Sequence, residues 1–122
     1  MRRLGIPSIE DRIVQRSLLF LLEAVFEKTF SEKSHGFRPK KGAHTVCKNI
    51  RQWKGVSWFI EGDIVDFFDT INHQKLMHLI SLRIKDQRVL DLLWKILRTK
   101  VLVDGKLQKT GKGVPQGSVI SP

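Results

Sequence analysis

Apolar residues that recur every three or four positions most constrain what this chain can fold into. From Ile9 to about Lys28 the aliphatic and aromatic side chains keep this spacing, which predicts one long amphipathic helix. Ser8 is the expected helix N-cap, and Asp11 stands three residues later, as in a capping box. The polar residues of this helix fall mostly on the opposite face: Arg12, Gln15, Arg16 and Glu23.

The remaining elements include both helices and strands. Helical spacing returns in three later segments, residues 43–53, 74–82 and 87–97. The β-branched and aromatic run Ser57–Val65 predicts a buried strand that ends in acidic residues. Asp104-Gly105, with apolar residues on both sides, predicts a tight β-hairpin over residues 101–108. Helices first and a sheet later indicate an α+β class, with helices packed on a partial antiparallel sheet.

The chain is strongly basic. Twenty-two Lys and Arg against 12 Asp and Glu give a net charge of +10, which favours a polyanionic partner, most often nucleic acid. An anionic membrane and an incidentally basic soluble protein are the alternatives. The single cysteine, Cys47, excludes an internal disulfide and a cysteine-based zinc site. The apolar stretch Ser17–Phe26 is too short to span a bilayer, and the N-terminus lacks a secretory signal, so we expect an intracellular protein without a membrane partner.

The acidic residues are concentrated within nine positions: Glu61, Asp63, Asp66 and Asp69. Hard divalent cations such as Mg²⁺ take oxygen ligands, and two of them can clamp both oxygens of a phosphoryl transfer. Asp63 lies inside an apolar strand pattern, where an unpaired carboxylate would be costly, and this favours a functional role. For Asp69 we prefer a solvated carboxylate that caps the following helix.

Three further features bear on function. Phe67 and Phe68 put an aromatic ring near the place where a nucleotide would lie, although a core position is also open, for Phe67 above all. The glycine-rich run Gly113–Ser118 lets the backbone approach a ligand and includes Gln116, a donor and acceptor; a plain tight turn is the alternative. Basic residues gather after residue 31 and around the hairpin, which suggests a track for a phosphate backbone. The histidines lack metal-ligand spacing and are interpreted as structural or phosphate-facing.

Four segments, in this order, resemble the reverse-transcriptase module of group II intron-encoded proteins: RRLGIPSIEDRIVQ, SEKSHGFRPKKGAH, FIEGDIVDFFDTINH and GKGVPQGSVISP. The resemblance covers essentially the whole chain. It implies a fingers portion over residues 1–56 and a partial palm over residues 57–122. It also implies an RNA-directed DNA polymerase that acts in intron mobility and splicing. The implied partners are an RNA template, intron RNA, a DNA primer and deoxynucleoside triphosphates, with two Mg²⁺ ions in the complete site.

Carried over position by position, the resemblance implies roles for single residues. Asp63 would be the first catalytic, metal-binding aspartate, and the backbone carbonyl of Ile64 would help to hold the second ion. Phe68 would pack under the incoming sugar and exclude a 2′-hydroxyl. The nucleotide-binding residues would be Arg38, Asp66, Phe67, Phe68 and Gln116. Contacts with template or other RNA would come from Ile6, Arg12, Lys40 and Lys41.

Some features depart from the family pattern. Arg3 stands where proline is usual, and Ser118 where a second glycine is usual. The Tyr/Phe-x-Asp-Asp strand that supplies two further carboxylates is absent from the sequence, and we interpret both ends of the chain as cuts. We therefore expect no DNA polymerisation by these 122 residues alone. Three alternatives stay open: an RNA-binding maturase module that aids splicing without polymerisation, a reverse transcriptase of retron or diversity-generating type, and a decayed remnant. The location would be a bacterial cytoplasm or an organelle matrix.

Overall fold

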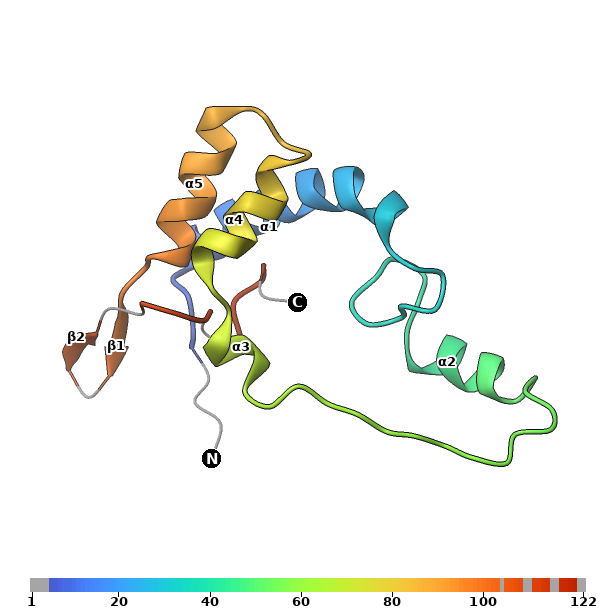
Figure 1. Cartoon of the computed structure of the whole chain (residues 1–122). Helices are drawn as coiled ribbons and strands as arrows, with labels where there is room; N and C mark the ends of the chain where they lie inside the picture. Colours follow the sequence, from blue (N-terminus) through green and yellow to red (C-terminus); the bar gives the residue numbers. More distant parts are fainter. Residues whose placement is uncertain (1–4, 104, 109–110, 115–116, 121–122) are drawn as a thin grey trace.

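The computed structural model describes residues 5–103, 105–108, 111–114 and 117–120, and within them it has helices and one hairpin (Figure 1). The helices are α1 (Ile9–Phe26), the 3₁₀ helix η1 (Glu27–Thr29), α2 (Ala43–Ile50), α3 (Phe67–Thr70), α4 (His73–Ser81) and α5 (Gln87–Leu97). The strands β1 (Val101–Val103) and β2 (Lys106–Gln108) are antiparallel, with Leu102 opposite Leu107. These elements confirm the α+β class. No helix among the described residues is long and apolar enough to cross a bilayer.

Helix α1 begins at the predicted residue. The Ser8 hydroxyl accepts a hydrogen bond from the backbone N–H of Asp11 at 3.1 Å, as an N-cap does. The same hydroxyl donates to the Asp11 carboxylate at 3.0 Å. In a full capping box that carboxylate would accept from the backbone N–H of Ser8, so the sequence predicts the cap correctly but not the reciprocal bond.

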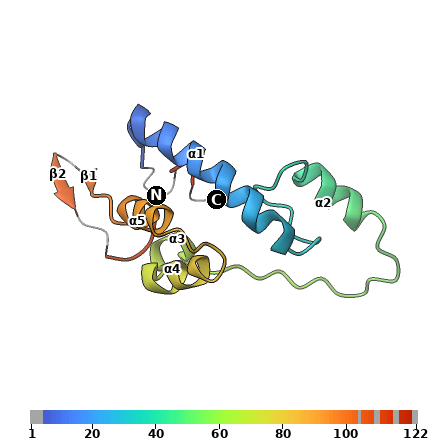
Figure 2. The same ribbon diagram turned by 90° about the horizontal axis from the view of Figure 1, so that it is seen from above.

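The core lies where α1 crosses α4 and α5 (Figures 1 and 2). Its buried apolar residues come from all three helices: Leu18, Met77, Leu93 and Leu97. Val114 and Ile120, near the end of the chain, pack against this core. A helix from residues 1–56 therefore shares its core with two helices from residues 57–122, and the domain boundary at residue 56 stays a prediction.

The predicted strand Ser57–Val65 is wrong. Among the described residues this segment pairs with no other strand, and it runs as an extended connection from α2 to α3 (Figure 1). Its apolar side chains are exposed, Trp58 by 87% and Ile60 by 93%. β-branched and aromatic residues fit a strand, but a strand also needs a hydrogen-bonding neighbour, and the β1–β2 hairpin lies far from this segment in both views (Figures 1 and 2).

Helix α2 and the loop before it form a lobe apart from α4 and α5 (Figure 2). The predicted apolar stripe of this helix includes Ile50 and Trp53, but both remain about half exposed, at 43% and 54%. Helix α2 ends at Ile50, so Trp53 follows the helix instead of continuing its stripe.

Candidate functional site

The glycine-rich segment, defined here as residues 111–114 and 117–120, contacts the turn that contains α3. The backbone N–H of Val114 donates to the Phe68 carbonyl at 2.8 Å, and the N–H of Gly113 donates to the Ile71 carbonyl at 2.9 Å. The buried His73 ring contacts the Gly113 carbonyl through Nε2 at 2.5 Å. Because a carbonyl oxygen only accepts, Nε2 carries the hydrogen. Three hydrogen bonds thus join segments about 40 residues apart, and His73 has a structural role.

Gly113 is required at this contact. Its φ is +75°, in the left-handed region that favours glycine. A Cβ atom there would lie 2.6 Å from the Phe68 carbonyl oxygen, 2.7 Å from the Asp69 carbonyl oxygen and 2.8 Å from the Asp69 Cα. Gly113 therefore allows the backbone to approach α3 closely, and the approach of this run to a ligand stays a prediction.

The other end of the glycine-rich segment is fixed to α1 by Gln15. The side-chain Oε1 of Gln15 accepts from the Ser118 hydroxyl at 2.7 Å and from the Val119 backbone N–H at 3.0 Å. Gln15 is 7% exposed and Ser118 is 9% exposed. The helical spacing predicts Gln15 on the polar face opposite the apolar one, and this prediction is wrong. The available signal is the position of Gln15 three residues before the buried Leu18, which puts both on one side of the helix.

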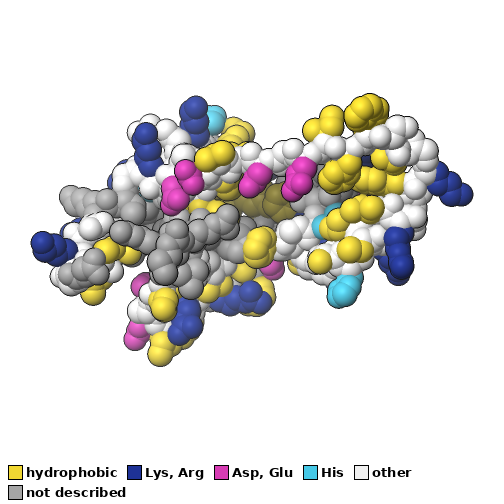
Figure 3. All heavy atoms as spheres, turned by 90° about the horizontal axis from the view of Figure 1, so that it is seen from below, with side chains coloured by type: hydrophobic (Ala, Val, Ile, Leu, Met, Phe, Trp, Pro, Cys, Tyr) yellow, Lys and Arg dark blue, Asp and Glu magenta, His cyan; other side chains and the backbone are white. Residues whose placement is uncertain are grey.

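The acidic segment leads into α3. Asp63 is exposed, and its Oδ1 accepts a hydrogen bond from the backbone N–H of Ile64 at 2.9 Å. Asp66 adopts a left-handed conformation, with φ of 49°, and begins α3. Acidic side chains lie in a row on the face seen in Figure 3. In the described part of the chain, no three Asp, Glu, His or Cys side chains converge as metal ligands, so Asp63 on its own does not fit a two-ion site.

Two expectations about the neighbours of Asp63 are corrected. Asp69 does not cap the next helix: it lies exposed within α3, and Asn72 caps α4 by accepting from the Lys75 N–H at 3.1 Å. Phe67 is 48% exposed, which excludes the core alternative for this residue. Its ring meets the partly buried Phe68 ring edge to face, with centroids 5.4 Å apart.

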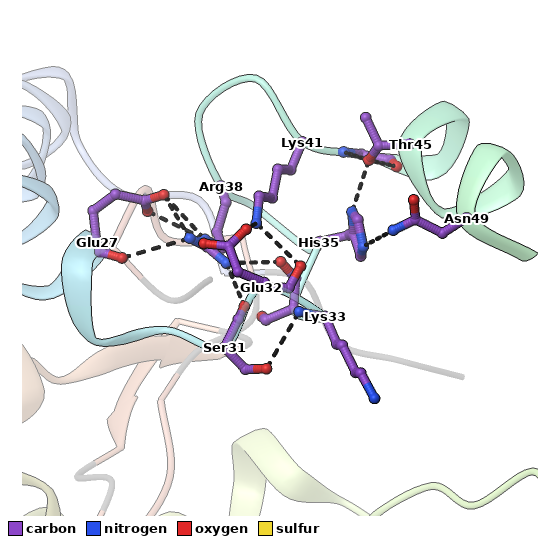
Figure 4. Close-up of polar contacts among 11 residues, drawn as sticks. Glu27, Ser31, Glu32, Lys33, His35, Arg38, Lys41, Thr45 and Asn49 are labelled. Atoms are coloured by element: carbon purple, nitrogen blue, oxygen red, sulfur yellow. Dashed lines mark hydrogen bonds and ion pairs between the residues drawn. The ribbon is translucent and has the colours of Figure 1, made fainter.

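Arg38, predicted to reach a triphosphate, is engaged by its own loop (Figure 4). Its Nη2 donates to the Glu27 carboxylate at 2.8 Å, and its Nη1 donates to the carbonyls of Ser31 at 2.6 Å and Ser34 at 2.9 Å. Its Nε donates to the Glu27 carboxylate at 3.1 Å, and Nη2 makes a longer contact of 3.5 Å with the Glu27 backbone carbonyl. All five N–H donors of the guanidinium therefore have protein acceptors. The bond to Glu27 raises the pKa of Arg38. In this arrangement Arg38 holds the loop together. Its contact with a nucleotide stays a prediction, and it requires that phosphate oxygens replace some of these protein acceptors.

The same loop is tied to α2. The His35 ring contacts the Thr45 hydroxyl at 2.8 Å and the Asn49 side-chain amide at 3.1 Å (Figure 4). The Lys41 ammonium donates to the Glu32 carboxylate at 2.8 Å, and this bond lowers the pKa of Glu32. Lys41, one of the predicted RNA contacts, is thus already paired with an acid, and His35 has a structural role.

The other predicted RNA-binding residues lie on exposed surface. An open groove of about 460 Å³ lies between α1 and Val119 and is lined by Ile9, Arg12, Ile13, Arg16, Ser17 and Val119. Arg12 therefore borders a groove with an apolar floor. Ile6 is 83% exposed before α1, and Lys40 is exposed in the loop with φ of 60°. Gln116 lies outside the described residues.

Comparison with known proteins gives one family and a consistent group of relatives. The family "Reverse transcriptase (RNA-dependent DNA polymerase)" matches residues 1–122. The chain is 43% identical over 123 residues to the group II intron-encoded protein LtrA of Lactococcus lactis subsp. cremoris, and the match covers 100% of this chain and 20% of LtrA. It is 40% identical over 129 residues to protein YkfC of Escherichia coli (strain K12), covering 100% of this chain and 34% of YkfC.

A plant relative extends the same pattern. The chain is 40% identical over 93 residues to "Nuclear intron maturase 1, mitochondrial" of Arabidopsis thaliana, with 75% of this chain and 13% of that protein covered. The resemblance to group II intron-encoded proteins is thereby confirmed, while the roles of single site residues remain predictions. The chain belongs to the reverse transcriptase family.

Proposed function

We propose that these residues form the fingers (1–56) and the front of the palm (57–122) of an RNA-directed DNA polymerase that serves the mobility and splicing of a group II intron. One observation carries the proposal: the glycine-rich segment is docked on α3. This contact brings a close-approach glycine against the Phe68 backbone, although Phe68 and Gly113 are 45 positions apart in sequence, and Asp63 lies in the segment that leads into the same turn. A carboxylate, an aromatic ring and a backbone that a ligand can approach closely are the groups that a nucleotide pocket needs.

The proposed chemistry is two-metal nucleotidyl transfer. Divalent ions bound here, Mg²⁺ in this proposal, would polarise the phosphoryl oxygens. Asp63 and the carbonyl of Ile64 would supply ligands, and the other carboxylates would come from outside these 122 residues. Phe68 would lie under the sugar. The backbone N–H groups of Asp66 and Phe67, together with Gln116 and a released Arg38, would face the triphosphate.

The proposed nucleic-acid partner is an RNA template and the intron RNA, with a DNA primer. The groove on α1 supports this, because Arg12 and Arg16 stand beside an apolar floor, where phosphate and ribose could both be accommodated. Ile6 and Lys40 would extend the contact, as would Lys41 if it left Glu32. The names of the relatives, among them a bacterial intron-encoded protein and a mitochondrial intron maturase, support a role in introns and allow either a bacterial cytoplasm or an organelle matrix as the location.

The test is primer extension on an RNA template with Mg²⁺. The polypeptide would carry these residues and continue through the segment that follows them in the relatives. Asp63→Ala should abolish extension, whereas Asp69→Ala, which removes an exposed carboxylate from α3, should retain it. An inactive parent polypeptide, or equal loss in both variants, would refute Asp63 as the metal ligand of a polymerase. The 122 residues alone should not extend a primer.

A second function, an RNA-binding maturase module without polymerase activity, is favoured by the net charge of +10. It predicts tight intron RNA binding that weakens steeply with salt and survives Asp63→Ala. Such binding together with no primer extension by the parent polypeptide would support this module in place of the polymerase.

A further inference from the structure

We propose that Gln15 is a positioning residue: its amide oxygen anchors the glycine-rich segment to α1 and so sets the nucleotide pocket from a distance. The inference rests on the proposed function for its effect on nucleotides. The anchor itself is a property of the fold and can be tested without activity.

The bonding of Gln15 makes its oxygen specific. A helical side chain that is 7% exposed is ordinarily apolar, because burial of an amide is costly unless the amide is hydrogen-bonded. Here a single oxygen accepts two donors, the Ser118 hydroxyl at 2.7 Å and the Val119 N–H at 3.0 Å. An apolar residue of similar volume could fill the space but could not hold either donor.

The segment that Gln15 holds contributes to both the groove on α1 and the Phe68 side of the proposed pocket. Val119 borders the groove on α1 and donates to Gln15, so this bond places one wall of the groove. Toward its N-terminal end the same segment is bound to Phe68 through the N–H of Val114. Among the described residues Gln15 makes no hydrogen bond to α3, so in this proposal its effect on the Phe68 side of the pocket passes along the chain from Val119 to Val114.

Substitutions at Ser118 and Gln15 remove one or both of the anchoring hydrogen bonds, so their effects should differ in size. Serine stands at position 118, where the family pattern usually has glycine, and its hydroxyl makes the shorter of the two bonds. With that hydroxyl removed, the Val119 bond would remain. Loss of function should therefore be partial in Ser118→Ala, larger in Gln15→Leu, and small in Gln15→Glu, which keeps an acceptor oxygen.

The first experiment is hydrogen exchange of backbone amides in the 122-residue chain. Gln15→Leu should speed exchange at Val119 by roughly ten-fold, the usual consequence of losing a buried hydrogen bond, while exchange in α5 stays unchanged. Ser81→Ala is the control, because Ser81 lies on α4 outside the groove that Val119 borders, and its hydroxyl bonds the His78 carbonyl of its own helix at 2.7 Å. Unchanged exchange at Val119 in Gln15→Leu would overturn the anchor.

The second experiment measures nucleotide KM and kcat in the extended polypeptide. Gln15→Leu should raise KM roughly ten-fold with a change in kcat of less than about three-fold, and Gln15→Glu should restore KM. Equal KM in wild type and Gln15→Leu, or a fall in kcat alone, would overturn the positioning role. If the wild type were inactive, the proposed function would fail, and hydrogen exchange would still decide the anchor. If Gln15→Leu did not fold, Ser118→Ala and Gln15→Glu would decide the KM effect.

Discussion

Replacing Gly113 with alanine should destabilise the fold more than the same change at Gly55 or Gly105. Those two glycines also have positive φ, but a Cβ atom on either would meet open space. Two effects add at Gly113. Alanine at φ of +75° costs about 1–2 kcal/mol, because its Cβ crowds the backbone in the left-handed region. The new Cβ would also meet the carbonyl oxygens of Phe68 and Asp69 at 2.6 and 2.7 Å. Backbone atoms cannot turn aside as a side chain can, so overpacking should add about 1–3 kcal/mol.

The matched control is Gly105→Ala in the hairpin. Gly105 also has φ of +75°, and apart from its chain neighbours no atom of the described residues lies within 4 Å of its hypothetical Cβ. Gly105→Ala should therefore cost only the backbone contribution of about 1–2 kcal/mol, and Gly113→Ala about 2–5 kcal/mol. The difference between the two variants isolates the contact of the glycine-rich segment with α3.

Urea unfolding followed by far-UV circular dichroism measures both free energies of unfolding under one condition. Equal destabilisation in the two variants, within about 0.5 kcal/mol, would refute the close approach of the glycine-rich segment to α3. A fall in the m-value confined to Gly113→Ala would mean that the native state of this variant buries less surface, as expected if the glycine-rich segment separates from α3.

Three further changes test other parts of the structure. Arg38→Lys keeps the charge but loses the fork that bonds Glu27 and the loop carbonyls, so amide exchange in that loop should accelerate; an unchanged rate would contradict the structural role of Arg38. The side-chain hydrogen bond from Arg88 lowers the pKa of Asp86 from 3.8 to about 2, so this carboxylate stabilises the fold above about pH 4 and loses that effect as pH falls through about 2. The urea midpoints of wild type and Asp86→Asn should therefore differ at pH 6 and converge near pH 2, and a constant difference would count against this. Leu97→Ala should cost about 2–5 kcal/mol of unfolding free energy by opening a cavity in the core, whereas Ile60→Ala, at an exposed position, should change it by less than about 0.5 kcal/mol; similar losses would contradict the placement of the core.

Local signals predict the longer helices α1, α2, α4 and α5, because the hydrogen bonds and caps of a helix join residues close in sequence, whereas the short η1 and α3 are not predicted. The Ser8 cap and the predicted limits of α5 agree with the structure to the residue, and α4 agrees to within one residue at each end. Helical bonds join residues four positions apart, so spacing and caps contain most of the necessary information. The β1–β2 hairpin is predicted for the same reason, since both of its strands and its turn lie within eight residues.

The error at Ser57–Val65 has the opposite cause. The residue types favour a strand, but strand formation depends on a neighbour that the composition of the segment does not specify. Ile60 at 93% exposure and Trp58 at 87% show how much apolar surface this segment leaves uncovered in the described structure. Exposed β-prone segments of this kind pair with other strands or aggregate, so the segment is the expected weak point for solubility of the chain.

The candidate site depends on distant contacts, and this explains which residues the sequence could and could not assign. Gln15 and Ser118 are 103 positions apart, and neither shows in its local pattern that the other will bind it. The family resemblance predicts that Arg38 faces a nucleotide, yet its donors are satisfied by Glu27 and two loop carbonyls, which no spacing rule predicts. Motifs therefore identify the residues on which a site can be built, whereas non-local hydrogen bonds decide whether each one contacts the ligand or holds another in place. The two bonds that Gln15 accepts support its proposed positioning role, and any nucleotide contact by Arg38 would require release of its bonds to Glu27.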